Sequence, residues 1–83
     1  MKITLKLYAS LGAFLPPQAE RNAIQIDVPE GATVRQILDS HQVPMETCHL
    51  ILVNGHFSPP ALAHARALSD GDTVAVWPPI AGG

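Results

Sequence analysis

The residues of this 83-residue chain that could do chemistry are few, and the most unusual of them stand at its end. Residues 78–83 read Pro-Pro-Ile-Ala-Gly-Gly and directly follow a short apolar run. Fully extended, such a segment spans at most about 20 Å. Gly82 and Gly83 lack Cβ atoms, so a partner's backbone can approach them closely. The carboxylate of Gly83 is ionised at neutral pH, and it becomes an electrophile only after activation, for example as an acyl-adenylate. A frayed end is the alternative interpretation.

Other kinds of chemistry find little support in the sequence. The glycine-rich loops that bind ATP or dinucleotides are absent, and so is the Gly-x-Ser-x-Gly turn of serine hydrolases. We therefore expect no cofactor bound by the chain itself, and ATP must be supplied by an activating partner. The histidines are spaced seven or eight residues apart, which matches no compact metal motif, so no metal is expected. Asp70 and Asp72 fit a turn better than an acid/base pair, and Cys48 fits inert packing before a buried strand.

Composition narrows the class of protein. Hydrophobic residues make up 47% of the chain and charged residues 14%, which predicts a folded domain rather than a disordered segment. No apolar run approaches the roughly 20 residues of a membrane span. Five basic and seven acidic residues form no basic stripe, so nucleic acid is not an expected partner. A single cysteine and the lack of an apolar leader predict a cytoplasmic protein. We expect one domain at 1–77 and a flexible tail at 78–83.

Alternation of apolar and polar residues predicts the strands. Residues 2–8 and 23–28 alternate, and we expect these two strands to pair antiparallel. Residues 49–53 form a continuous apolar run, which predicts a central strand covered on both faces. Residues 73–77 are the last strand. A helical turn is expected at 9–14, tight turns at 54–55 and 69–72, and a short strand with a loop within 57–68.

One helix is well marked. Thr33 can cap it, and Gln36 stands three residues later, as in a capping box. Val34, Ile37, Leu38 and His41 fall on one stripe at helical spacing. We expect a helix at about 33–42 whose stripe packs on a set of strand residues: Ile3, Leu5, Ile26, Leu52 and Val74. The order of elements predicts an α+β domain with this helix on one face of a mixed four- to five-stranded sheet.

Three stretches of the chain resemble a known family. They are residues 33–38, 52–55 and 68–83, which read TVRQIL, LVNG and LSDGDTVAVWPPIAGG. In this order they resemble MoaD and ThiS, the small sulfur carriers with the ubiquitin-like β-grasp fold. The aromatic-Pro-Pro-x-x-Gly-Gly end is closer to MoaD, with Trp77 in place of the usual phenylalanine. Residues 55–61 fit the pattern of neither branch.

The resemblance implies a function as a carrier protein, or as the non-catalytic small subunit of molybdopterin synthase. An E1-like enzyme of the MoeB or ThiF type adenylates the terminal glycine with ATP, and a sulfur donor protein then converts it to a thiocarboxylate. In MoaD the tail enters the large subunit and supplies sulfur for molybdopterin, the organic part of the molybdenum cofactor. Carried over, these roles fall on Gly83 as the acceptor and on Gly82 beside it.

A set of apolar residues is expected to contact the partner: Phe57, Trp77, Pro78, Pro79, Ile80 and Ala81. For Trp77 the alternative is that it closes the core. Three other functions remain open: a ThiS-like carrier for the thiazole of thiamin, a ubiquitin-like modifier, and an interaction module that never uses the tail. The chain's two lysines, Lys2 and Lys6, offer few sites for building chains of the modifier on itself.

Overall fold

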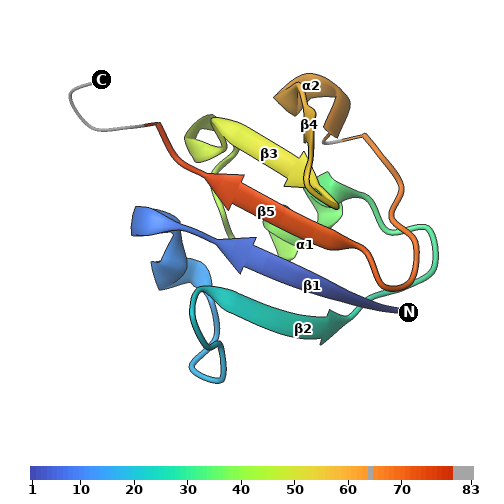
Figure 1. The fold of residues 1–83 in the computed structure, drawn as a ribbon, viewed down its shortest axis with the longest axis horizontal. Helices are drawn as coiled ribbons and strands as arrows, with labels where there is room; N and C mark the ends of the chain where they lie inside the picture. The colour runs from blue at the N-terminus through green and yellow to red at the C-terminus, as the bar shows by residue number, and fades with distance from the viewer. Residues whose placement is uncertain (64, 80–83) are drawn as a thin grey trace.

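In a computed structural model that describes residues 1–63 and 65–79, the chain forms a five-stranded sheet covered on one face by its main helix (Figure 1). The elements are, in chain order, β1 (Lys2–Leu7), the 3₁₀ helix η1 (Ala9–Phe14), β2 (Ala23–Asp27), α1 (Val34–Ser40), the 3₁₀ helix η2 (Met45–Thr47), β3 (Leu50–Val53), β4 (His56–Ser58), α2 (Pro60–Ala63) and β5 (Thr73–Trp77). The strands lie in the order β2-β1-β5-β3-β4. The predicted α+β class and mixed sheet are confirmed.

The centre of the sheet is a parallel pair made by the first and last strands. β1 and β5 pair in register from Thr4 opposite Thr73 to Leu7 opposite Val76. The other three pairings are antiparallel, including the predicted pairing of β1 with β2. Because β1 and β5 run the same way, both strands end at the same end of the sheet, where η1 begins (Figure 1).

The start of α1 is fixed by the predicted capping box. The Gln36 backbone N–H donates to Thr33 Oγ1 over 3.2 Å, and the Thr33 backbone N–H donates to Gln36 Oε1 over 3.0 Å. Each bond satisfies a backbone donor that a helix N-terminus leaves free. The helix ends at Ser40, two residues before the expected end, and Gln42 takes a positive φ of 62°. Within the described residues, no helix is long and apolar enough to cross a membrane.

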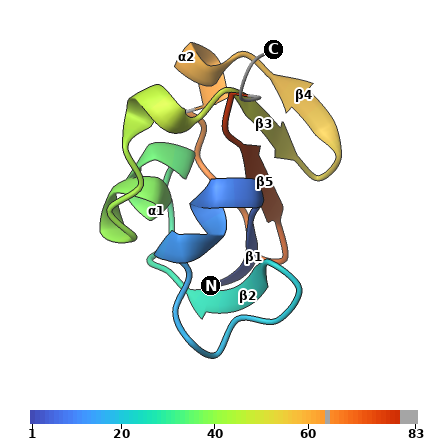
Figure 2. The same ribbon diagram turned by 90° about the vertical axis from the view of Figure 1, so that its left-hand side faces the viewer.

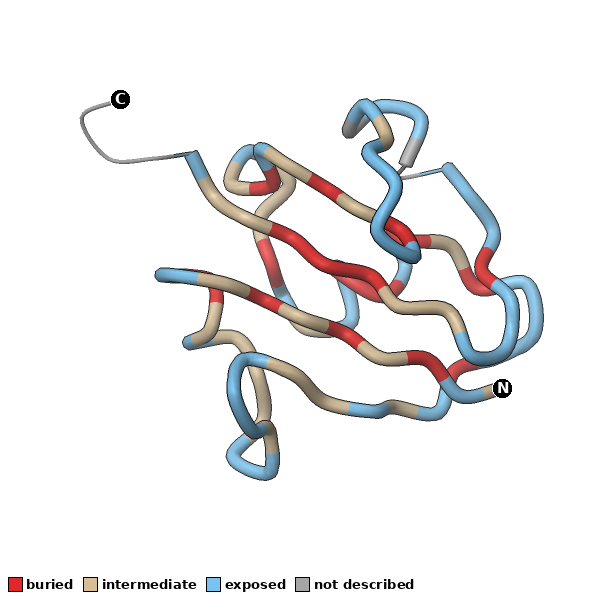
Figure 3. Tube along the Cα trace, in the orientation of Figure 1, coloured by how far each residue is buried: buried red, intermediate tan, exposed pale blue. Residues whose placement is uncertain are grey.

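The core lies between the sheet and α1. Figure 2 shows α1 on one side of the sheet, and Figure 3 shows the buried stretches of β1, β3 and β5. Val34, Ile37 and Leu38 of α1 are buried in one cluster with Ile3, Leu5 and Val74, as predicted, and Ile26 packs on its border. Leu52 was assigned to this cluster wrongly. In β3 the buried residues are Ile51 and Val53, whereas Leu50 and Leu52 are half-buried on the other face. The expectation that β3 is covered on both faces is therefore wrong, because only one face meets the helices.

Two turns at the N-terminal end of β5 are joined by hydrogen bonds. Asn54 and Gly55 have φ values of 53° and 81°, which suits a tight hairpin turn between β3 and β4. Asp72 Oδ1 accepts from the Asn54 side-chain amide over 2.9 Å, and Asp72 Oδ2 accepts from the Ser69 N–H over 2.8 Å. Both bonds hold the pKa of the Asp72 carboxyl below its ordinary value, and the bond from Asn54 has the larger effect.

Two expectations about short helical segments have different outcomes. The helical turn at 9–14 is confirmed as η1. In the ambiguous stretch the short strand is confirmed as β4, but α2 was missed. At four residues, α2 is too short to show the periodicity by which a helix is recognised.

We predict that Leu38→Ala lowers the free energy of unfolding by about 2–5 kcal/mol. Leu38 has no exposed surface and fills the space between α1 and the sheet, so truncation leaves a cavity. Urea denaturation measures the change. Leu62→Ala is the matched control, because Leu62 is 70% exposed and its loss should cost within about 0.5 kcal/mol. Equal midpoints for the wild type and Leu38→Ala would contradict the docking of α1.

A second prediction concerns acid stability. Because the native pKa of Asp72 is lowered, its ionised form stabilises the fold at a pH above the unfolded value of about 3.9. That contribution is lost as the pH falls through the native pKa. The gap in unfolding free energy between wild type and Asp72→Asn should thus be constant from about pH 7 to 5 and shrink below about pH 4. Asp27→Asn, on the exposed edge of β2, is the control. A gap that widened on acidification would contradict the assignment.

Candidate functional site

The structure describes the root of the C-terminal segment. β5 ends at Trp77, and Pro78 and Pro79 follow it outside the sheet. Four predicted site residues lie outside the described residues: Ile80, Ala81, Gly82 and Gly83. The part of the candidate site that the structure describes is therefore residues 77–79, which we call the tail root, and the segments that flank them.

Trp77 is held from both sides at the end of the sheet. Its ring stacks on that of Tyr8, with ring centroids 4.4 Å apart and planes 7° from parallel. The Trp77 carbonyl accepts from the His49 N–H over 3.0 Å, and the Val76 carbonyl accepts from the Tyr8 N–H over 3.1 Å. Trp77 is half-buried and lies outside the buried core cluster. It therefore does not close the core, and its ring forms part of the surface of the tail root.

An open apolar pocket of about 430 Å³ adjoins the tail root. Its lining comes from three segments: residues 9–10 at the start of η1, residues 49–50 at the start of β3, and residues 77–79. Sequence reasoning found only the last of these. The other two are distant in sequence, and they meet residues 77–79 only because β1 and β3 both flank β5.

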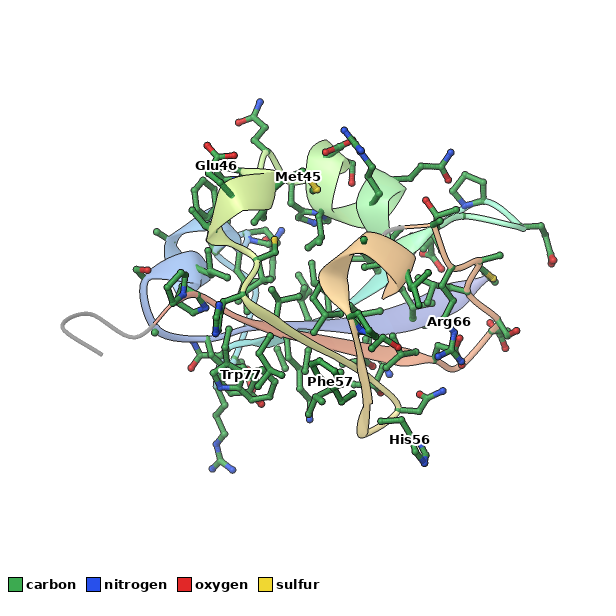
Figure 4. The ribbon with its side chains drawn as sticks, turned by 90° about the horizontal axis from the view of Figure 1, so that it is seen from above. Met45, Glu46, His56, Phe57, Arg66 and Trp77 are labelled. Carbon is green, nitrogen blue, oxygen red and sulfur yellow. The ribbon has the colours of Figure 1, made fainter. Side chains whose placement is uncertain are left out.

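Phe57 lies on the same side of the sheet as Trp77, opposite the helices (Figure 4). Its side chain is 61% exposed. Phe57 stands opposite Leu52, and Leu50 stands opposite Trp77, so these pairs share one face. We call this surface the apolar face, and its members are Tyr8, Leu50, Leu52, Phe57 and Trp77. Both aromatic residues that were expected to contact a partner are thus on the uncovered side of the sheet.

Among the described residues, the other candidate chemical groups do not form a site. Cys48 is buried, and its Sγ donates to the Pro44 carbonyl over 3.6 Å. Burial raises the pKa of the Cys48 thiol, so it stays protonated and unreactive at neutral pH. Among residues 1–63 and 65–79, no three His, Cys, Asp or Glu side chains gather where they could bind a metal ion. His49 lies at the tail root, and His56 lies at the far end of β3.

Solved structures share this fold. Small archaeal modifier protein 1 from Haloferax volcanii is 25% identical with a TM-score of 0.66, and the match covers 95% of this chain and 98% of that one. A Pyrococcus furiosus protein provisionally assigned as molybdopterin converting factor subunit 1 is 25% identical with a TM-score of 0.63, over the same shares. A chain in the complex of subunits 1 and 2 of the Helicobacter pylori 26695 molybdopterin-converting factor is 20% identical with a TM-score of 0.60, over all of both chains.

These likenesses confirm the predicted ubiquitin-like β-grasp fold and the predicted resemblance to MoaD-type proteins. Comparison with curated protein sequences gives no significant match. The sequence model of one family, described as Mut7-C ubiquitin, matches residues 1–81. That match spans nearly the whole chain, so the chain belongs to the Mut7-C ubiquitin family.

Proposed function

We propose that the chain is a ubiquitin-like sulfur carrier whose Gly83 carboxylate becomes a thiocarboxylate and donates sulfur in molybdopterin synthesis. The observation that carries the proposal is the tail root. The two prolines that precede the Gly-Gly sequence leave the sheet beside an apolar pocket and the apolar face. A partner that contacts these surfaces meets the chain at Pro79, directly before the last four residues of the sequence. The likeness to molybdopterin converting factor subunit 1 supports the choice of pathway.

The chemistry requires activation by a partner, an E1-like enzyme of the MoeB or ThiF type. A Gly83 carboxylate oxygen attacks the α-phosphorus of ATP bound by that enzyme, and pyrophosphate leaves. A sulfur nucleophile such as hydrosulfide then attacks the carbonyl carbon, and AMP leaves with the C–O bond electrons. The chain's own contribution is a terminal carbonyl without a neighbouring side chain, four residues after Pro79 in the sequence. Cys48 takes no part, since its thiol is buried and protonated.

The apolar face fits a large-subunit partner. Aromatic residues dominate the energetics of many interfaces, and Trp77 and Phe57 are both accessible on one side of the sheet. The Helicobacter pylori structure is a complex of subunits 1 and 2, which supports a partner of this kind for the present chain. We propose that the same surface serves the activating enzyme, because both partners must receive the same tail.

A second candidate function is that of a ubiquitin-like modifier, which the likeness to small archaeal modifier protein 1 favours. The adenylate would be the same in that case, but a lysine amine of another protein would attack the carbonyl, AMP would leave with the C–O bond electrons, and an isopeptide bond would form. A ThiS-like carrier would share the thiocarboxylate and differ only in the acceptor. The nature of the product therefore separates the modifier from the two carriers.

The tail prediction is tested by intact mass after incubation with an E1-like enzyme, MgATP and sulfide. Conversion of the carboxylate should add about 16 Da, the difference between sulfur and oxygen, as expected for nucleophilic exchange at a carbonyl. Removal of Gly83 should abolish the gain, and Gly83→Ala should reduce it strongly, because it adds a Cβ to the Cα next to the reacting carbonyl carbon. Stability should change little, because the buried core of the described residues ends at Val76.

Cys48→Ala is the matched control for this experiment and should gain the same mass as the wild type. A gain that disappears in Cys48→Ala, or that survives removal of Gly83, would overturn the proposal. The intact mass of the protein before the reaction also shows whether Gly83 is the terminal residue, as the proposal requires. Formation of an isopeptide-linked product without a thiocarboxylate would favour the modifier.

We predict that Trp77→Ala weakens binding to the activating enzyme at least about tenfold, since aromatic anchors at interfaces commonly carry 1–2 kcal/mol or more. Leu62→Ala, which removes an exposed leucine outside the apolar face, should leave the affinity unchanged. Titration calorimetry measures both variants, and thermal unfolding of each separates affinity from stability. Full affinity in Trp77→Ala, with only a lower stability, would contradict a binding role.

A further inference from the structure

In the described part of the chain, no strand pairs with the outer edge of β2, so this edge offers backbone hydrogen-bonding groups. Met1 and Val28 exchange two hydrogen bonds of 2.8 Å across the β1–β2 ladder. In an antiparallel ladder such pairs recur at every second residue, so the backbone N–H and C=O groups of Ile26 and Ile24 also point toward β1. Gln25 and Asp27 therefore direct their N–H and C=O groups outward. Ala23 is closed by two hydrogen bonds with Glu20, of 3.0 and 2.9 Å, so the open stretch runs from Gln25 to Asp27.

The opposite border of the sheet is protected in a way that β2 is not. β4 is only three residues long, and Pro59 and Pro60 follow it directly. Proline has no N–H to offer to a further strand, and short strands and prolines are common means of blocking a sheet edge. The open stretch of β2 contains neither proline nor lysine. The chain thus leaves one of its two sheet edges available for pairing.

A groove runs beside this edge on the helix side of the sheet. It has a volume of about 650 Å³ and lies between the end of β2, the turn at 29–31 and α1. Its floor is apolar and is made by Ile26, Val28, Ala32 and Ile37. We call this feature the edge groove. It differs from the pocket at the tail root, with which it shares no lining residue.

The charged side chains that line the edge groove are acidic, and the Met1 ammonium donates to the carbonyl of Val28 over 2.8 Å. Glu30 lines it, and so does Asp27, whose side chain lies on the opposite face of β2 from Ile26; no lysine or arginine lines it among the described residues. Lys2 Nζ lies 3.9 Å from Asp27 Oδ1, but the two side chains are 56% and 83% exposed, so this ion pair is weak. Asp27 is therefore accessible to a second cation.

We propose that the edge groove binds an extended segment of a partner protein that adds a sixth strand to β2. Such a segment would pair its backbone with Gln25 and Asp27. Across a strand pair, opposite residues point to the same face. The partner residue opposite Ile26 therefore points into the apolar groove and is aliphatic, while the residue opposite Asp27 points to the other face and is lysine or arginine.

The test uses the full chain, labelled with ¹⁵N, and two capped heptapeptides. One alternates lysine with isoleucine, and the other alternates glutamate with isoleucine. Saturation with the lysine peptide should slow amide hydrogen exchange of Gln25 and Asp27 at least about tenfold and leave the amides of β4 unchanged. The glutamate peptide should bind at least about tenfold more weakly, because Asp27 and Glu30 repel it.

Two variants separate backbone pairing from charge. Gln25→Pro removes one edge N–H and leaves the lining of the groove intact, so it should weaken binding. Asp27→Lys combined with Glu30→Lys should reverse the preference between the two peptides. Glu46→Lys, a charge reversal on η2 outside the groove, is the matched control and should change neither.

The proposal is overturned if saturating peptide leaves the exchange of Gln25 and Asp27 unchanged, or if both peptides bind equally. Should Gln25→Pro fail to fold, as judged by circular dichroism, the exchange measured on the wild type still decides. Removal of Gly83 should not affect peptide binding, so this result is independent of the outcome at the tail.

Discussion

The parallel pairing of β1 with β5 is the constraint on which the rest of the structure depends. Parallel neighbours cannot be joined by a hairpin, so the intervening residues must cross over, and here they supply β2, α1, β3 and β4 on the way. The same pairing makes both central strands end together, which brings Tyr8 against Trp77. Had β5 run the other way, the tail root would lie beside Met1 instead of beside η1 and the start of β3.

The two ends of this central pair have different chemistry. At the N-terminal end, a polar turn is hydrogen-bonded to β1. The Lys2 N–H donates to Asp70 Oδ1 and the Gly71 N–H donates to the Lys2 carbonyl, each over 2.7 Å. At the C-terminal end, an aromatic stack and an apolar pocket take their place. These polar groups already form hydrogen bonds with one another, so a partner would gain little free energy by binding them. Apolar surface gains about 25 cal/mol for each Å² removed from water, so the tail end is the better place for a partner.

Local sequence signals predicted most elements of this chain and the pairing of β1 with β2, but they did not predict how β3 and β5 pair. The capping box at Thr33 and Gln36 and the alternation in β1 depend on neighbouring residues, and both were found from sequence. The face of Leu52 was misassigned because a run of four apolar residues has no alternation to show which side is buried. His49 and Leu50 were missed at the tail root because only the β3–β5 register brings them to Trp77. The apolar face could be expected from Phe57 and Trp77, but its continuity across three strands could not.

The positions of the two candidate surfaces have a consequence for the proposed function, in which the chain visits more than one enzyme. The tail root lies at the end of the central strands, whereas the edge groove lies along the border strand and uses none of the same residues. A partner at the tail root must release the chain before the next can receive the tail, so binding there has to remain reversible. A separate contact along β2 would keep the chain near its partners through such an exchange, because a second linked contact raises the effective concentration of the first. On the two proposals together, contacts at the tail root would stay weak without loss of the complex.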